Sequence, residues 1–188
     1  MLKKNILFYL LFGSLFFQNL LANEKELIIE KIGKIENLTF NFEQIINNKK
    51  ETGVCFLVFN NKLKCEYYED NKEKEILING KTLVVMQKRY NKNYFYPLSK
   101  SPFSNILNKE SLINFIKEAK MELNENIDLV YLDKEDQKIT IYFNKKNFDL
   151  LGWKIKDKLQ NNIFFSLKIK SVNKKYNDKI FLIPKAID

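Results

Sequence analysis

The chain has 188 residues, a formal net charge of +9 and a hydrophobic content of 45%. It contains no histidine, which excludes Ser-His-Asp and Cys-His catalysis, histidine acid–base chemistry and most zinc sites. The positive charge comes from scattered lysines, with Arg89 as the only arginine, so bidentate readers of bases and phosphates are absent. We therefore expect no nucleic-acid partner, metal, cofactor or enzymatic activity. A two-carboxylate glycosidase is the enzyme alternative that stays open.

The N-terminus has the pattern of a secretory signal peptide. Lys3 and Lys4 precede an apolar stretch from Ile6 to Phe17, and Ala22 is the expected residue before the cleavage site. The apolar stretch is shorter than the roughly 20 residues of a transmembrane helix, although an uncleaved anchor is an alternative. The sequence thus predicts a signal peptide over residues 1–22 and a single exported, periplasmic domain over residues 23–188.

The first elements after the signal peptide are a helix and a strand. Residues Glu24–Glu36 carry apolar side chains at helical spacing, from Leu27 to Ile35. From Leu38 to Phe42 the spacing changes to strict alternation, which predicts a half-buried strand.

A hairpin that contains both cysteines follows. The strands Val54–Phe59 and Leu63–Tyr68 flank a loop at Phe59–Asn61. A three-residue loop places Cys55 opposite Cys65, and an even cysteine count in an exported protein favours a disulfide. A bridge that closes so short a loop contributes roughly 2–3 kcal/mol. We expect a structural bridge rather than a redox pair, because no CxxC spacing is present.

The remaining elements are mostly short strands. Asn79-Gly80 is a strong hairpin signal, and Ser101-Pro102 predicts the start of a short helix that includes Ile106 and Leu107. A second helix is expected over Glu110–Lys120. The other predicted strands are Ile76–Ile78, Thr82–Met86, Asn93–Tyr96, Ile127–Leu132, Lys138–Phe143, Leu151–Lys156, Ile163–Val172 and Lys179–Ile183. The chain is therefore mainly β with helices (α+β), a barrel or half-barrel of about ten antiparallel strands with helices as its cover.

The aromatic content suggests what such a sheet could hold. The chain has 16 Phe and 9 Tyr, and several of them alternate along the predicted strands. These residues either pack the sheet against the helices or, as a set, line a cavity for alkyl chains. The residues alone leave both possibilities open.

The order of these segments resembles the outer-membrane lipoprotein carrier family, LolA. The matching segments are Phe40-Asn41-Phe42-Glu43-Gln44, the hairpin from Gly53 to Tyr67, Asn79-Gly80-Lys81-Thr82-Leu83, Ser101-Pro102-Phe103 and the closing run Ile180–Pro184. The resemblance covers essentially the whole chain after the signal peptide. It implies an unclosed antiparallel β-barrel with a helical lid.

The resemblance also implies a function and partners. Such a carrier takes the acyl chains of outer-membrane-directed lipoproteins from an inner-membrane ABC-type release complex and passes them to an outer-membrane acceptor, if one is present. We expect it to act as a monomer. The acyl-chain-binding residues expected from alternation and resemblance are Phe40, Phe42, Leu57, Phe59, Leu63, Val84, Met86, Ile106 and Leu107. The alternative is a periplasmic sensor or interaction domain of the same fold that binds a membrane regulator or lipid.

Two departures from the family pattern stand in the hairpin. Family members usually carry an Arg-Pro pair at the hairpin tip, which Phe59-Asn60 replaces, and the arginine is thought to hold the lid closed. An aromatic residue near the end of the second strand is replaced by Cys65. Lid control is therefore expected to differ in this chain. The sister acceptor family, LolB, consists of lipoproteins, which need a cysteine at the cleavage site. This chain has no cysteine near its predicted cleavage site, which argues against LolB.

Overall fold

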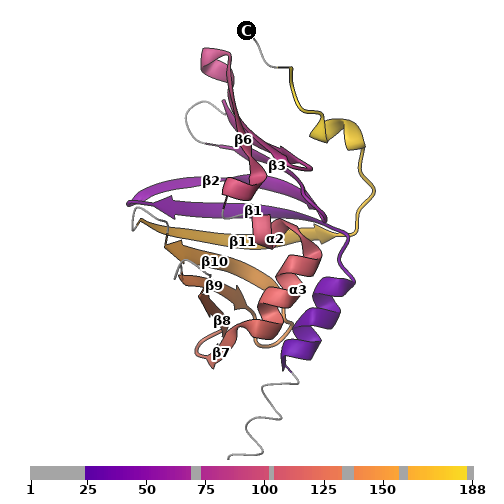
Figure 1. Cartoon of the computed structure of the whole chain (residues 1–188), viewed down its shortest axis with the longest axis vertical. Helices are drawn as coiled ribbons and strands as arrows, with labels where there is room; N and C mark the ends of the chain where they lie inside the picture. Colours follow the sequence, from indigo (N-terminus) through magenta and orange to yellow (C-terminus); the bar gives the residue numbers. More distant parts are fainter. Residues whose placement is uncertain (1–23, 69–72, 102–103, 133–137, 157–160, 186–188) are drawn as a thin grey trace, which may run out of the picture.

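One antiparallel sheet forms the body of the protein. The computed structural model describes residues 24–68, 73–101, 104–132, 138–156 and 161–185. Its eleven strands lie in the order β6-β5-β4-β3-β2-β1-β11-β10-β9-β8-β7 (Figure 1). They are β1 Asn37–Ile46, β2 Lys49–Val58, β3 Lys62–Tyr67, β4 Lys74–Asn79, β5 Thr82–Gln87, β6 Lys92–Pro97, β7 Lys120–Leu123, β8 Ile127–Leu132, β9 Lys138–Phe143, β10 Leu150–Lys156 and β11 Asn162–Val172.

The strand order follows from two meanders that meet in the middle. The chain runs outward from β1 to β6, crosses to the opposite edge, and returns from β7 to β11. There β11 pairs antiparallel with β1, with Phe42 opposite Leu167. Because β6 and β7 are the two edges, the sheet is an unclosed barrel, as the sequence predicts.

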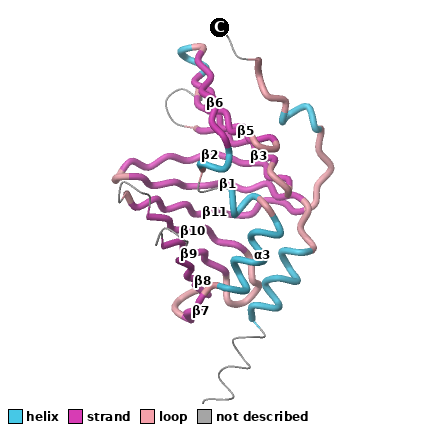
Figure 2. Tube along the Cα trace, in the orientation of Figure 1, coloured by secondary structure: helices cyan, strands magenta, loops and turns pink. Residues whose placement is uncertain are grey.

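The helices gather on one side of this sheet (Figures 1 and 2). A helix over residues 24–33 comes first, and α2 (Ser104–Leu107) and α3 (Lys109–Glu118) lie between β6 and β7 in the chain. Their apolar faces join the strands in one hydrophobic core, with Ile28, Ile116 and Ile141 fully buried. We call the strand face beneath the helices the inner face and the opposite one the outer face. Among the described residues, no helix is long and apolar enough to span a membrane.

The observed elements differ from the sequence predictions most clearly in β1, in β7 and in the C-terminal segment. β1 extends to Ile46, and β7 was not predicted because Lys120–Leu123 is short and shows little alternation. The strand predicted over Lys179–Ile183 is wrong: Asp178–Phe181 forms a 3₁₀ helix, η4, and no strand follows it within the described chain. The predicted signal peptide and the helix start at Pro102 and Phe103 lie outside the described residues.

Gly53 permits a close approach within the sheet. A Cβ at this position would lie 2.1 Å from the Glu66 carbonyl oxygen and 2.6 Å from a ring carbon of Phe42. Phe42 is the cross-strand partner of Gly53 and packs its ring over the bare glycine backbone. A glycine in this strand therefore sets the position of a large aromatic side chain.

The C-terminal segment covers the outer face. Phe181, in η4, is 1% exposed and packs with Val58, Leu77 and Val84. The Asn79 side-chain amide donates a hydrogen bond of 3.0 Å to the Phe181 carbonyl oxygen. We call residues 173–185 the C-terminal strap. The apolar run Lys179–Ile183, which the sequence predicts as a strand, therefore packs over the outer face instead of pairing in the sheet.

Candidate functional site

A small apolar cavity lies between the inner face and the helices. Its volume is about 20 Å³. Strands β1 to β4, β10 and β11 form its walls, and α2 and the start of α3 close it. The lining residues are Leu38, Phe40, Cys55, Leu57, Phe59, Leu63, Cys65, Tyr67, Ile76, Ile106, Leu107, Leu112, Leu150, Trp153, Phe165 and Leu167. None of them is charged.

Most of the residues proposed from the sequence to bind acyl chains lie around this cavity. Those in its lining are Phe40, Leu57, Phe59, Leu63, Ile106 and Leu107. They come from β1, the β2–β3 hairpin and α2, which are separated by up to 67 positions in the chain (107 − 40). The sheet order and the crossing of the lid bring them together.

Val84 and Met86 lie on the other side of the sheet. Val84 is fully buried in the outer cluster with Phe181, and Met86 packs against that cluster. Their neighbours Leu83 and Val85 belong to the inner core instead. The predicted facing of β5 is thus wrong by one residue. The run Leu83–Met86 is apolar at every position, so alternation gives no signal for either face.

Aromatic rings form the floor beneath the cavity. Phe165 stacks on Trp153 with ring centroids 4.3 Å apart and on Phe42 at 5.2 Å. The Phe42 ring in turn meets Tyr67 edge-on at 4.9 Å. Phe42 therefore supports two lining residues from below rather than lining the cavity itself.

The sequence predictions missed several lining residues. Trp153, Phe165 and Leu167 come from the C-terminal meander, which local motifs did not connect with the hairpin. Leu63, Cys65 and Tyr67 alternate along β3, so the same pattern that placed Leu63 in the lining would also have placed Tyr67 there. Alternation along β11 would likewise have placed Phe165 and Leu167 on one face.

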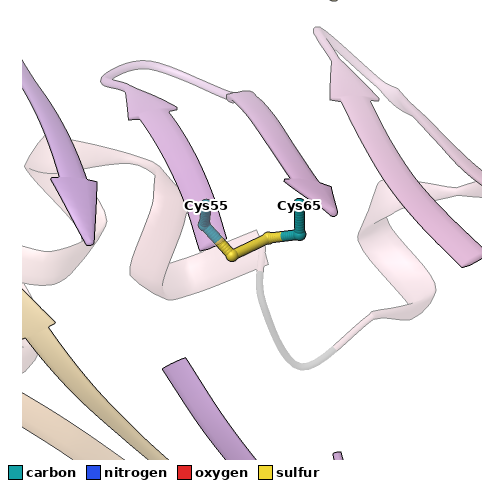
Figure 3. Close-up of a disulfide and its surroundings, with 2 residues drawn as sticks. All are labelled: Cys55 and Cys65. Carbon is teal, nitrogen blue, oxygen red and sulfur yellow. A yellow bond between two sulfur atoms is a disulfide. The ribbon is translucent and has the colours of Figure 1, made fainter. Parts of the chain in front are cut away.

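A disulfide crosses one wall of the cavity. Cys55 of β2 and Cys65 of β3 stand directly opposite each other and are bonded, with a Cα–Cα distance of 4.1 Å (Figure 3). The pairing of Leu57 with Leu63 in the same hairpin confirms the register expected from the sequence. Both cysteines are buried and contribute apolar sulfur surface to the cavity.

Tyr67 is the polar member of the hairpin wall. Burial raises the pKa of its phenol, and the nearby Glu51 carboxylate raises that pKa further. Lys74 places its ammonium 4.1 Å from the centre of the Tyr67 ring and pairs with Glu51 at 2.8 Å. The phenol therefore stays neutral at physiological pH, and the ion pair marks the polar end of the wall.

The tip of the β2–β3 hairpin contacts the junction between α2 and α3. The Asn61 backbone N–H donates a hydrogen bond of 3.2 Å to the Leu107 carbonyl oxygen at the end of α2. The Asn60 side-chain oxygen accepts a hydrogen bond of 3.0 Å from the Lys109 backbone N–H at the start of α3. Lys109 also places its ammonium 5.5 Å from the centre of the Phe59 ring. We call α2 and this junction the lid.

The cavity as it stands is too small to hold a long alkyl chain. A volume of about 20 Å³ holds roughly one water molecule. Sites for small organic ligands usually measure about 300–1,000 Å³. A long acyl chain therefore requires the side chains of the lid and walls to move apart.

The sequence matches a known family over most of its length. Residues 33–184 match the family described as outer membrane lipoprotein carrier protein LolA. The chain belongs to the LolA family. No curated protein matches the sequence. A solved structure with a TM-score above 0.5 shares the fold at low identity.

Three solved structures that match this chain differ in identity and in coverage. An uncharacterized conserved protein from Thermus thermophilus is 11% identical, with a TM-score of 0.54 over 87% of this chain and 94% of that chain. A LolA superfamily protein from Nitrosomonas europaea is 13% identical, with a TM-score of 0.43 over 83% and 96%. The MucA/MucB complex from Pseudomonas aeruginosa gives 8% identity and a TM-score of 0.49 over 87% and 61%. At these identities the likeness concerns the fold.

Proposed function

We propose that this LolA-family protein is a periplasmic carrier that shelters the acyl chains of lipoproteins between the inner and outer membranes. Its partners would be an inner-membrane ABC-type release complex, the lipoproteins themselves and, where one exists, an outer-membrane acceptor. It would act by binding and release, without catalysis. The observation that carries the proposal is an uncharged cavity beneath a lid, inside a fold whose family is described as a lipoprotein carrier.

The energetics of acyl chains suit this role. Moving an alkyl chain out of water is worth about 0.8 kcal/mol per CH₂, or about 12 kcal/mol for a chain of about 16 carbons. Such a chain does not cross an aqueous compartment unprotected. Release from the carrier therefore requires direct transfer to a membrane or to a site of similar affinity.

The lid contacts are weak enough to yield to such a ligand. Asn60 accepts one hydrogen bond from the lid and Asn61 donates one to it, and each is worth about 1 kcal/mol net. Ile106 and Leu107 are buried in the closed state, and each contributes about 1.5–3 kcal/mol. The free-energy cost of exposing Ile106 and Leu107 is offset when an acyl chain replaces their side chains against the cavity walls.

The hairpin tip contacts the lid through one asparagine side chain and one backbone amide. The hairpin tip holds the lid at the two helix ends that meet there, since Asn61 binds the last carbonyl of α2 and Asn60 the first amide of α3. Neither contact depends on a charged side chain. We expect the lid equilibrium to be nearly independent of salt between ordinary ionic strengths.

The proposal is tested by asking what the protein carries. Protein purified from its native periplasm should contain triacylated lipoprotein, detected by mass spectrometry of the intact complex and its lipid extract. Leu63→Glu and Leu167→Glu place a carboxylate in the lining on β3 and on β11, respectively, and each should abolish co-purification. Lys168→Glu, next to Leu167 but exposed on the outer face, is the matched control and should retain it.

A further variant separates loss of binding from loss of folding. Leu57→Trp fills the cavity without adding charge and should reduce lipoprotein binding while the protein stays folded by circular dichroism, since overpacking costs about 1–3 kcal/mol. Normal lipoprotein content in Leu63→Glu and Leu57→Trp would overturn the cavity assignment. An empty cavity together with a bound peptide in the wild type would favour the sensor alternative.

A further inference from the structure

The edge strand β6 exposes tyrosines on the face that leads to the cavity. Tyr94 and Tyr96 are 39% and 50% exposed. They pair across the sheet with Val85 and Leu83, which belong to the inner core. Directly opposed residues share a face, so both tyrosines stand on the inner side, beyond the reach of the helices. Lys92 alternates with them and lies on the same side.

Positive charge surrounds these tyrosines. The chain has no acidic residue from Ile76 to Lys109, and Arg89, Lys92 and Lys100 are exposed at the two ends of β6. Tyr90, 62% exposed, lies beside Arg89 in the 3₁₀ helix η2 (Lys88–Tyr90) at the tip of the β5–β6 hairpin. We call the set Arg89, Tyr90, Lys92, Tyr94, Tyr96 and Lys100 the β6 edge surface.

Two of the carboxylates near this surface pair with other lysines, and a third, that of Glu73, lines a pocket together with Arg89 and Tyr90. Glu75 pairs with Lys88 and lies 3.9 Å from Lys64. Glu51 pairs with Lys74 at 2.8 Å. Within the described residues, no ion pair involves Arg89, Lys92 or Lys100. These three cations therefore remain available to an anionic partner.

The β6 edge surface is continuous with the lid. After Pro97 the chain forms the 3₁₀ helix η3 (Leu98–Lys100), in which Leu98 is buried in the core, and α2 begins at Ser104. Figure 1 shows β6 running down from the projecting η2 tip toward α2. A partner that binds β6 would thus contact a segment that lies next to the lid in the chain.

We propose that the β6 edge surface docks the protein on an anionic lipid bilayer, so that the lid faces the headgroups. Tyrosines with exposed rings favour the membrane interface, and each Lys or Arg near an anionic leaflet is worth about 1 kcal/mol, or roughly fivefold in binding. This inference rests on the proposed carrier function for its purpose. The binding itself requires no lipoprotein.

Two features of β6 favour a bilayer over an added β-strand. Lys92 and Pro97 stand at the ends of this edge strand. Charged residues and proline on an edge strand oppose pairing with another strand, because the charge resists burial and proline lacks an N–H donor. The surface of an anionic bilayer binds without backbone hydrogen bonds to β6 and leaves the charged side chains in contact with water.

The test is flotation of the full protein with vesicles that contain no lipoprotein. Vesicles of equal parts phosphatidylethanolamine and phosphatidylglycerol should bind it, and vesicles of phosphatidylcholine alone should not. The triple variant Arg89→Ser, Lys92→Ser, Lys100→Ser should weaken binding to anionic vesicles roughly 100-fold at low salt. The control Lys146→Ser, Lys168→Ser, Lys170→Ser removes the same charge from exposed positions elsewhere and should change binding less than about threefold.

A second variant addresses the tyrosines. Tyr94→Ser with Tyr96→Ser should leave binding that disappears as salt is raised, whereas the wild type keeps a salt-resistant fraction. Equal loss in the two triple variants would overturn the proposal, since net charge alone would then explain binding. Failure of the wild type to bind anionic vesicles, or preference for an acidic protein over them, would also overturn it. Failure of lipoprotein carriage alone would leave it standing.

Discussion

The lid and the C-terminal strap cover opposite faces of the same sheet, and they are held in different ways. The lid lies over a cavity and is attached at its junction by two hydrogen bonds from the hairpin tip. The strap inserts Phe181 into its own cluster, where the ring stacks on Phe56 at 5.8 Å. Lys62 also pairs with Asp178 at 2.8 Å at the start of η4.

Under the proposed function, this difference separates a movable cover from a fixed one. A cover that is displaced by a ligand needs weak, separable contacts, whereas a cover that stabilises the fold fills the space beneath it with its own side chain. The lid fits the first description and the strap the second. Variants that weaken each cover should therefore affect different measurements.

The largest effect is expected from the strap. Phe181→Ala removes a ring that is 1% exposed and should lower the free energy of unfolding by about 3–5 kcal/mol. Urea denaturation measures the change. The neighbouring Leu182→Ala, at a side chain 68% exposed, should change stability by less than about 0.5 kcal/mol. Equal effects of the two variants would contradict the role of Phe181 as the filling side chain.

Removal of the disulfide should have the next largest effect. Cys55→Ala with Cys65→Ala opens a loop with a sequence separation of 10 and should cost about 2–3 kcal/mol in stability. A reductant should destabilise the wild type by a similar amount and leave the variant unchanged. If reductant shifts neither protein in urea denaturation, the bridge does not stabilise the cavity wall.

A smaller effect is expected from the lid junction. Asn60→Ala removes the acceptor for the Lys109 backbone N–H and should shift the lid equilibrium by about 1 kcal/mol, or about fivefold. Hydrogen exchange at the Lys109 amide measures this opening. Exchange in the β1 core should stay unchanged, and Asn162→Ala, at an exposed position in β11, is the control. Slower or unchanged exchange at Lys109 would show that Asn60 does not hold the lid.

The smallest effect concerns the Tyr67 phenol in the cavity wall. Its pKa is raised above the unfolded value of about 10, so its contribution to stability is complete below that pH and is lost as the pH rises further. Near pH 10.5 the loss is about 0.8 kcal/mol. The stability of Tyr67→Phe should lack this decline between pH 9 and about 10.5. Thermal unfolding measures the stability of both proteins at each pH. An equal decline in the wild type and in Tyr67→Phe would assign the decline to other groups.

Local sequence patterns predicted the parts of the site in which one face is apolar and the other polar. Phe40 and Leu63 alternate with polar neighbours, and both line the cavity as predicted. The hairpin register was also predictable, because a short loop fixes which residues are opposed. These predictions require only neighbours in the chain.

The remaining parts depend on tertiary packing. The run Leu83–Met86 is apolar on both faces because the strap covers its outer side, and nothing local distinguishes the two sides. The strap itself was predicted as a strand, since an apolar segment looks the same whether it pairs or packs. Trp153 and Phe165 enter the cavity wall only through the pairing of β11 with β1 and β10.

The lid also lies in the segment of chain that links the two halves of the sheet. Residues 98–119 form the one covalent connection between the meander β1–β6 and the meander β7–β11. The two meanders are otherwise joined by the β1–β11 ladder, the shared core and the C-terminal strap, which packs Phe181 against strands of the first meander. A single cut in the lid would therefore divide the polypeptide into two pieces, each with one strand of that ladder. The two fragments produced by such a cut would pair with each other through the β1–β11 ladder at the centre of the sheet.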